Sequence, residues 1–258
     1  MLPDQKETLV PHHLGDIQTS ARVAVITGDP DRVAALADAI GRPKSTWSKR
    51  GFVCTEINHD GDSVLIVATG IGGPATAIVA EELWQVGARQ IIRVGTCGAM
   101  QPHVRAGNLV ISTGSVRDEG TSHQYLPPSV PAIPDYNLLA TLIAEARASG
   151  ATHHVGLTHS KDAYYAERPE GLPLRGEWET KWAMLRSIGV LATEMEAAAL
   201  FAVAAVRGFQ AAAIFVSVDR TISAADVLSA LKGAAVIAVA SALAVKATTA
   251  GAVKEETR

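Results

Sequence analysis

The sequence has few cysteines, and this excludes scaffolds that depend on many of them. Only Cys54 and Cys97 occur among the 258 residues, and neither lies in a CxxC or other metal-ligand spacing. The pattern therefore indicates neither a disulfide framework nor a structural zinc site. We expect a reducing, cytoplasmic location and no metal.

The sequence also has no excess of basic charge and no export signal. The formal net charge is −3, whereas nucleic acid or an anionic membrane requires a basic partner. Residues 1–18 carry charged and histidine side chains, so they lack the apolar core of a signal peptide and are expected to form an N-terminal arm. The longest apolar stretch, near residues 234–245, is too short to span a membrane and is interpreted as the buried face of the last helix. We expect a small-molecule partner, with no nucleic acid and no membrane.

Short apolar runs alternate with glycine-bearing turns and helix-period segments, which is typical of an α/β fold. The length predicts one domain over residues 1–258. Strands are expected at residues 22–26, 52–58, 63–68, 90–94, 108–113, 154–159 and 211–218. Helices are expected from Pro30 to residue 40, from the turn at 70–74 to residue 86, and at 136–149, 178–187, 195–207 and 224–247. Residues 164–176 are expected to form a mobile loop and candidate lid, and residues 248–258 a frayed tail.

The motif GDPDR, from Gly28 to Arg32, places a glycine at a strand end and an arginine one turn into the following helix. Backbone N–H groups and a guanidinium can then converge on one anion, and phosphate is the obvious guest. A plain turn with Arg32 in solvent explains the motif equally well.

The motif RVGTCG, from Arg93 to Gly98, repeats this arrangement at a second strand end. Here an arginine, the hydroxyl of Thr96 and a glycine-rich turn are expected at the carboxyl edge of the sheet. A buried Arg93 requires an anion or a carboxylate as its partner. Cys97 has no His or Asn framework near it in sequence, so we interpret it as a small packing residue rather than a nucleophile.

The sequence Glu194-Met195-Glu196 places two carboxylates at the start of an alanine-rich helix. They can simply complement the helix dipole, which is worth roughly 0.3–1 kcal/mol. Alternatively, a carboxylate accepts the two hydroxyls of a ribose while Met195 lies against the sugar's apolar face.

These motifs, together with ATGIGGPATAIVAEEL at residues 68–83 and EMEAAALF at residues 194–201, occur in the order and spacing of the nucleoside phosphorylase-I family. The chain resembles that family, which includes uridine phosphorylases and hexameric purine nucleoside phosphorylases, from about His13 to the terminal helix. The resemblance implies a single α/β domain with a mixed, twisted sheet that curls into a distorted barrel flanked by helices. It also implies nucleotide salvage, no cofactor, inorganic phosphate as co-substrate, and a hexamer built from dimers with shared active sites.

The resemblance assigns roles to individual residues. Phosphate would be bound by Gly28, Arg32, Arg93 and Thr96, with Arg50 lent by a neighbouring subunit. Ribose would be bound by Met195, Glu196 and Thr96, with His13 of a neighbour at the 5′-hydroxyl, although a frayed N-terminal position also explains His13. Arg93 and Glu196 would act catalytically, because phosphate stabilises the positive charge that builds on the ribosyl ring and hydrogen bonds to the 2′-hydroxyl strengthen in the transition state.

The base preference stays open. The segment from Ser160 to Trp182 most resembles uridine phosphorylases, with Tyr164 against base and sugar and with Arg168 and Arg220 donating to the base. However, the glutamine that reads uracil is missing, and Glu167 cannot donate as an amide can. Asp219 before Arg220 resembles the purine enzymes, where an aspartate with a raised pKa protonates the leaving base; it can equally cap the turn and pair with Arg220. We favour uridine, with a purine nucleoside as the alternative.

Other functions differ in what they require. A hydrolytic nucleosidase does not need Arg32, Arg50 and Arg93 around one anion, and an NAD-dependent oxidoreductase needs a GxGxxG spacing that is missing after the first strand. A non-catalytic nucleoside-binding protein is compatible with the same residues. The potassium-binding side chains of some uridine phosphorylases are replaced by Gly51 and Ala75, so no potassium site is expected.

Overall fold

The computed structural model describes the backbone of residues 11–255 and the side chains of residues 11–245. Residues 1–10 of the predicted N-terminal arm and residues 256–258 of the predicted tail lie outside the described residues. The strands are β1 (Val23–Thr27), β2 (Arg42–Lys49), β3 (Phe52–His59), β4 (Asp62–Ala68), β5 (Gln90–Ala99), β6 (Leu109–Asp118), β7 (His153–Lys161), β8 (Ala192–Glu194) and β9 (Gln210–Val218). The helices are α1 (Val33–Ile40), α2 (Gly73–Gln85), α3 (Ser122–Tyr125), α4 (Tyr136–Ala148), α5 (Arg175–Ser187), α6 (Ala197–Arg207) and α7 (Ala224–Glu255), with short 3-10 turns η1 (Pro30–Arg32) and η2 (Tyr164–Glu167).

The nine strands form one mixed sheet in the order β2-β3-β4-β1-β5-β8-β7-β6-β9. An additional parallel pairing of β9 with β5 closes the last five strands of this order into a ring. The other joints of the ring are antiparallel for β5–β8 and β6–β9 and parallel for β6–β7 and β7–β8. The predicted mixed sheet that curls into a barrel is therefore confirmed.

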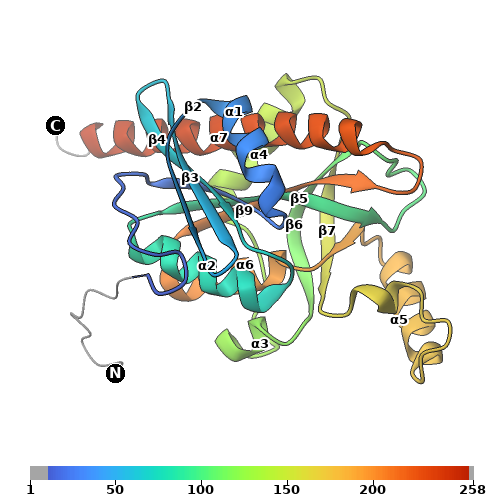
Figure 1. Ribbon diagram of the computed structural model, residues 1–258. Helices are drawn as coiled ribbons and strands as arrows, with labels where there is room; N and C mark the ends of the chain where they lie inside the picture. Colours follow the sequence, from blue (N-terminus) through green and yellow to red (C-terminus); the bar gives the residue numbers. More distant parts are fainter. Residues whose placement is uncertain (1–10, 256–258) are drawn as a thin grey trace.

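Helices cover the sheet on two faces, because each face carries apolar side chains from alternate strand positions. On one face α1, α4 and α7 pack together, and on the other α2 and α6 pack together with α3 beside them (Figure 1). α5 projects from the end of the molecule where β7 ends (Figure 1).

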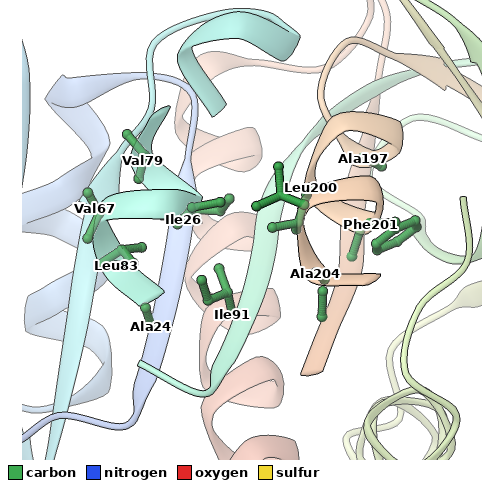
Figure 2. Packing of buried hydrophobic residues seen from close by; sticks show 14 of the residues in the cluster. Ala24, Ile26, Val67, Val79, Leu83, Ile91, Ala197, Leu200, Phe201 and Ala204 are labelled. Carbon is green, nitrogen blue, oxygen red and sulfur yellow. The ribbon is translucent and has the colours of Figure 1, made fainter. Parts of the chain in front are cut away.

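The core between the sheet and α2 and α6 is built from small and branched side chains. Figure 2 shows Leu83 of α2 and Leu200 of α6 on either side of Ile26 and Ile91, which belong to neighbouring strands. The alanines of α6, including Ala197 and Ala204, let this helix lie close to the sheet. This close packing fixes the N-terminus of α6, which borders the site described below.

A tight hairpin turn joins β3 to β4 near the edge of the sheet. Asp60 and Gly61, between β3 and β4, have φ values of 51° and 96°, which is the geometry that an Asp-Gly hairpin favours. The strands that the sequence predicted on either side of this turn are confirmed. β2, by contrast, was not predicted, because it is an edge strand with mostly exposed side chains and no apolar alternation.

Several predicted boundaries were wrong; for example, β6 continues to Asp118, past residue 113. Residues 95–98 form strand and not a turn, since β5 stays paired with β9 through Gly98 and with β8 through Ala99. α6 begins at Ala197 and not at Met195, because residues 192–194 form the short strand β8. α7 continues to Glu255, past residue 247.

The apolar part of α7 is longer than the sequence suggested. Residues Ala224–Val245 have a mean hydropathy of 2.0 and, by length and composition alone, could cross a membrane. However, Leu231, Ala235 and Val239 are buried in the core that α7 shares with α1 and α4. Packing within the protein thus accounts for the apolar composition of this helix.

Candidate active site

A cavity of about 1210 Å³ opens where β1, β5, β7 and β9 end. Ten of the twelve residues that the sequence proposed for the site line it: Gly28, Arg32, Arg93, Thr96, Tyr164, Arg168, Met195, Glu196, Asp219 and Arg220. Parallel strands carry their carboxyl ends to one edge of the sheet, which is why residues far apart in sequence meet here.

The GDPDR turn forms one wall of the cavity. Asp29 caps η1 by accepting a hydrogen bond from the Asp31 N–H at 3.0 Å, and its other carboxylate oxygen lies 3.3 Å from Nε of Arg32. A Cβ at Gly28 would lie 3.3 Å from the carbonyl oxygen of Gly70 and 3.8 Å from Nη2 of Arg93. The glycine therefore allows the two strand ends and the guanidinium of Arg93 to approach each other closely.

Arg93 is the most buried cation of the cavity wall apart from Lys161. Its side chain is 4% exposed, and Nη2 donates to Oε2 of Glu196 at 2.5 Å. Nε and Nη1 are buried without a hydrogen-bond partner among the described residues. Because a buried guanidinium is stable only when its N–H groups are paired, an anionic oxygen in the cavity would complete this site.

Two carboxylates organise the start of α6 beside Arg93. Oε2 of Glu194 accepts from the backbone N–H groups of Glu196 and Ala197 at 2.8 and 2.9 Å, so it caps the helix. Glu196 accepts from the Gly72 N–H at 2.7 Å through Oε1 and from Arg93 through Oε2. Glu196 is thereby held at the cavity wall from two sides.

The two carboxylates also influence each other. Burial raises the pKa of Glu194, and the negative charge of Glu196 raises it further, against the opposing effect of Arg93 and of a hydrogen bond from Ser160. The oxygens of Glu194 are occupied by Ser160 and by the N–H groups of Glu196 and Ala197. Glu196 is therefore the carboxylate of the pair that is better placed to accept from a ligand hydroxyl.

The opposite end of the cavity is formed by η2 and the end of β7. Tyr164 is 60% exposed and Arg168 is exposed, so both extend from the surface over the cavity. The predicted loop 164–176 contains η2 and the first two residues of α5. Glu167 lies in the cavity wall and forms an ion pair with Lys161 at 2.7 Å.

Asp219 caps the turn after β9, which is one of its two predicted roles. Its Oδ1 accepts from the N–H of Thr221 at 2.7 Å and from the hydroxyl of Thr221 at 2.6 Å. These hydrogen bonds lower the pKa of Asp219, so the raised pKa that a proton donor needs is not found. The expected pairing with Arg220 is also wrong, since no such ion pair forms among the described residues.

His13 and Arg50 do not line the cavity of their own chain. Arg50 sits in the turn between β2 and β3, where Nη1 lies 3.2 Å from Nε2 of His12. His13 contacts Glu82 at 2.8 Å, and Glu82 also accepts from the backbone N–H groups of His12, His13 and Leu14. Burial opposes the ionisation of Glu82, but the hydrogen bonds from Leu14 and His13 outweigh it, and the pKa of Glu82 is lowered.

Cys97 is buried at the cavity wall, where burial and the nearby Glu194 raise its thiol pKa. A thiol in this environment is a poor nucleophile, which agrees with the packing role predicted for it. Within residues 11–255, no group of three or more His, Cys, Asp or Glu side chains is arranged to hold a metal ion.

The cavity wall also contains residues that were not predicted from the sequence, among them Lys161 and Thr193. Lys161 is 1% exposed at the end of β7. The pattern that singled out Arg93, a cation ending an apolar strand, did not reach it, because β7 has the mostly polar sequence HHVGLTHSK. Thr193 lies on β8, a strand of three residues that leaves no periodic signal in the sequence.

Comparison with known proteins supports the family assignment. The Phosphorylase superfamily matches residues 22–250. The chain is 39% identical to the uridine phosphorylase of Escherichia coli over 218 residues, which cover 81% of this chain and 86% of the relative. It is 39% identical to the uridine phosphorylase of Treponema pallidum over 191 residues, 74% of each chain. It is 37% identical to the guanosine phosphorylase of Halorubrum lacusprofundi over 204 residues, 79% of this chain and 80% of the relative.

The matched region contains the GDPDR turn, β5 with Arg93, and the Glu194–Glu196 segment whose geometry is described above. These three segments and the motif at residues 68–83 are the four motifs that predicted the family from the sequence. The chain therefore belongs to the phosphorylase superfamily, with the fold and the motifs of its nucleoside phosphorylases.

Proposed function

We propose that this protein is a nucleoside phosphorylase that cleaves the N-glycosidic bond of a nucleoside with inorganic phosphate, giving the free base and ribose 1-phosphate. Uridine is the favoured substrate, since uridine phosphorylases prevail among the similar proteins. The observation that carries the proposal is Arg93, a buried guanidinium held by Glu196 with two N–H-bearing nitrogens left for an anion.

In this proposal phosphate lies against Gly28, Arg32, Arg93 and Thr96, which line one part of the cavity. The dianion is both the nucleophile at C1′ and the counter-charge for the positive charge that grows on the ribosyl ring. A hydrolytic nucleosidase would have no use for a buried guanidinium that keeps Nε and Nη1 without a hydrogen-bond partner at this position.

Ribose is bound by Glu196, Met195 and Thr96. Glu196 already accepts from Arg93 and from the Gly72 N–H, so its position does not change with the sugar. A hydrogen bond from the 2′-hydroxyl to this carboxylate strengthens as the ring becomes cationic, which lowers the barrier. The base lies between Tyr164, Arg168 and Arg220, whose guanidinium groups donate to carbonyl oxygens.

Phosphate dependence tests the proposal directly. The protein is incubated with uridine, thymidine, inosine, guanosine or adenosine, with and without inorganic phosphate, and release of the base is followed by absorbance. Base release only with phosphate, together with ribose 1-phosphate, supports the proposal. Free ribose without phosphate indicates a nucleosidase, and tight binding without turnover indicates a nucleoside-binding protein.

A purine nucleoside is the second candidate substrate. The similarity to a guanosine phosphorylase, at 37% identity, favours it. In the same assay, turnover of guanosine or inosine well above that of uridine would establish this alternative.

The proposed assembly is a hexamer built from three dimers, in which each active site takes Arg50 and His13 from the partner subunit. Two features support it: both residues lie outside their own cavity, and Glu82 holds the segment that carries His13 against α2. We also propose a cytoplasmic location, a role in nucleotide salvage and no need for a cofactor.

Mixing two inactive variants tests the shared site. Arg50→Ala and Glu196→Ala proteins are each inactive, but in a mixed dimer one site receives both intact halves. With complete subunit exchange at equal amounts, activity should return to about a quarter of the wild-type value. A mixture no more active than its parents, with exchange shown by native mass spectrometry, would contradict sharing.

A further inference from the structure

The part of the cavity wall formed by η2 and the end of β7 contains an ion pair. Nζ of Lys161 lies 2.7 Å from Oε1 of Glu167. Both side chains line the cavity, with Lys161 1% exposed and Glu167 32% exposed. The lysine therefore lies in the wall and the carboxylate faces the space where a base would lie.

The position of this carboxylate is fixed by the protein. A fully buried ammonium needs a counter-charge, since leaving a buried charge without its partner costs several kcal/mol. Lys161 is further held by donating to Oγ1 of Thr193 at 3.1 Å. The ion pair with Lys161 thus holds Glu167 in place, whether or not a base is bound.

A chain of polar contacts extends this support through the protein. Oγ1 of Thr193 lies 3.0 Å from Nδ1 of His159, and Nε2 of His159 lies 3.0 Å from Oδ2 of Asp118. Asp118 accepts from Nζ of Lys181 on α5 at 2.8 Å. Strands β6, β7 and β8 and helix α5 therefore all contribute to the placement of the Lys161–Glu167 pair.

An ionised carboxylate only accepts hydrogen bonds. Uracil presents N3–H between two carbonyls, and guanine and hypoxanthine present N1–H beside a carbonyl. Cytosine and adenine present a lone pair at the equivalent ring nitrogen, so a carboxylate facing that nitrogen gains no hydrogen bond from it and meets electrostatic repulsion; the exocyclic amino group beside it remains a donor. Arg168, one of two exposed arginines that line the same cavity, supplies the donor that the neighbouring carbonyl requires.

We infer that Glu167, held by Lys161, is the specificity-determining residue that accepts the ring N–H of a lactam base, and that the enzyme selects uracil, guanine and hypoxanthine nucleosides against cytosine and adenine nucleosides. The inference rests on the proposed function and deepens it. It is also compatible with the sequence similarity of this chain to both a uridine and a guanosine phosphorylase, because uracil and guanine share the lactam edge although they differ in size.

The test compares kcat/KM for uridine and cytidine, and for inosine and adenosine, in the full-length protein with phosphate. The wild-type enzyme should favour the lactam member of each pair by roughly 10²-fold or more. Glu167→Gln should reduce these ratios about tenfold or more, because an amide can turn its NH₂ group toward a ring lone pair. A ratio is unaffected by the amount of folded protein, so a general loss of stability does not imitate this result.

The variant Glu167→Gln leaves Lys161 buried without its carboxylate, so the double variant Lys161→Met/Glu167→Gln provides a second measurement with both charges removed. Its ratios should fall as those of Glu167→Gln do. Glu170→Gln removes an exposed carboxylate of the same loop that does not line the cavity, and it should keep the wild-type ratios. Wild-type ratios near one, or unchanged ratios in both Glu167 variants, would overturn the inference.

Binding of the free bases separates this inference from the proposed function. Calorimetry with uracil and cytosine in phosphate buffer measures selectivity without turnover. If no nucleoside is cleaved but uracil binds more tightly than cytosine and Glu167→Gln removes the difference, the proposed function fails and the base-reading role of Glu167 stands. If nucleosides are cleaved and the variants bind both bases as the wild type does, the inference fails alone.

Discussion

The two ends of the cavity differ in which elements carry their side chains. At the end that we propose to bind phosphate and ribose, Arg93, Glu194 and Glu196 are each at most 5% exposed, and they lie on β5, β8 and the start of α6. At the end that we propose to bind the base, Tyr164 and Arg168 are exposed and belong to η2 and the loop after it.

This difference separates the groups proposed to act on the glycosidic bond from the groups proposed to recognise the base. Side chains on strands and helix ends are held within tenths of an ångström by packing, which a reaction at C1′ requires. Side chains on surface turns tolerate substitution, so the base preference can change without disturbing the reacting groups. Lys161 is a buried side chain close to the proposed base site. Among the described residues of the 164–176 segment, Glu167 is the side chain that forms an ion pair with Lys161.

The largest effect on activity is expected from substitution of Arg93, the buried arginine of the proposed phosphate site. Arg93→Lys replaces a planar guanidinium, which can donate two parallel hydrogen bonds, with a single ammonium group. The loss of transition-state stabilisation should be on the order of 2–3 kcal/mol, so kcat/KM at subsaturating phosphate should fall roughly 30- to 150-fold. Steady-state kinetics with varied phosphate measure this change. Arg89→Lys, an exposed position just before β5, should leave the kinetics unchanged. Wild-type kcat/KM in Arg93→Lys would contradict the assigned role of Arg93.

A smaller effect is expected from displacing Arg93 without replacing it. A Cβ at Gly95 would lie 3.0 Å from Nη2 and 3.2 Å from Cζ of Arg93, and the guanidinium cannot yield freely because Glu196 holds it. Gly95→Ala should therefore lower kcat/KM by about tenfold. In Gly98→Ala on the same strand, the new Cβ meets only Thr193 Cγ2 at 3.5 Å, so a smaller loss is expected. Equal losses in the two variants would show that steric pressure on Arg93 is not the cause.

Substitution of Arg168 at the proposed base site should change KM more than kcat. Arg168→Ala removes an exposed donor to a base carbonyl, and the loss of one charged hydrogen bond of about 1.5–2 kcal/mol should raise KM for uridine roughly 10- to 30-fold with a smaller change in kcat. Separate measurement of kcat and KM checks this division. A fall in kcat with constant KM would place Arg168 with the reacting groups and remove the contrast between the two ends.

The smallest effect is expected at Asp219, which lines the cavity but only caps a turn. In Asp219→Asn the amide oxygen can still accept from Thr221, so turnover of uridine should fall by less than about threefold. The same variant should be assayed with inosine and guanosine. A loss of roughly 10²–10⁴-fold with a purine nucleoside would restore the role of Asp219 as proton donor to the base.

The sequence by itself determined the local parts of this protein. Alternating and helical periods located most strands and helices, Asp60-Gly61 located a hairpin, and four ordered motifs predicted the family and ten residues of the cavity wall. These features depend on residues close together in the chain, where the period of the apolar pattern and the conformational preferences of glycine and proline act directly.

Only the tertiary structure decided which distant groups meet. The closure of β9 onto β5, the pairing of Arg93 with Glu196 across 103 positions and the fixing of Glu167 by Lys161 depend on which strands become neighbours, and no local pattern encodes this. The extension of β5 through its glycine motif and the edge strand β2 were missed for the same reason, since pairing partners overrode the local signal. Asp219 binds Thr221 rather than Arg220, because the N–H and the hydroxyl of Thr221 both reach one carboxylate oxygen of Asp219 in the folded turn.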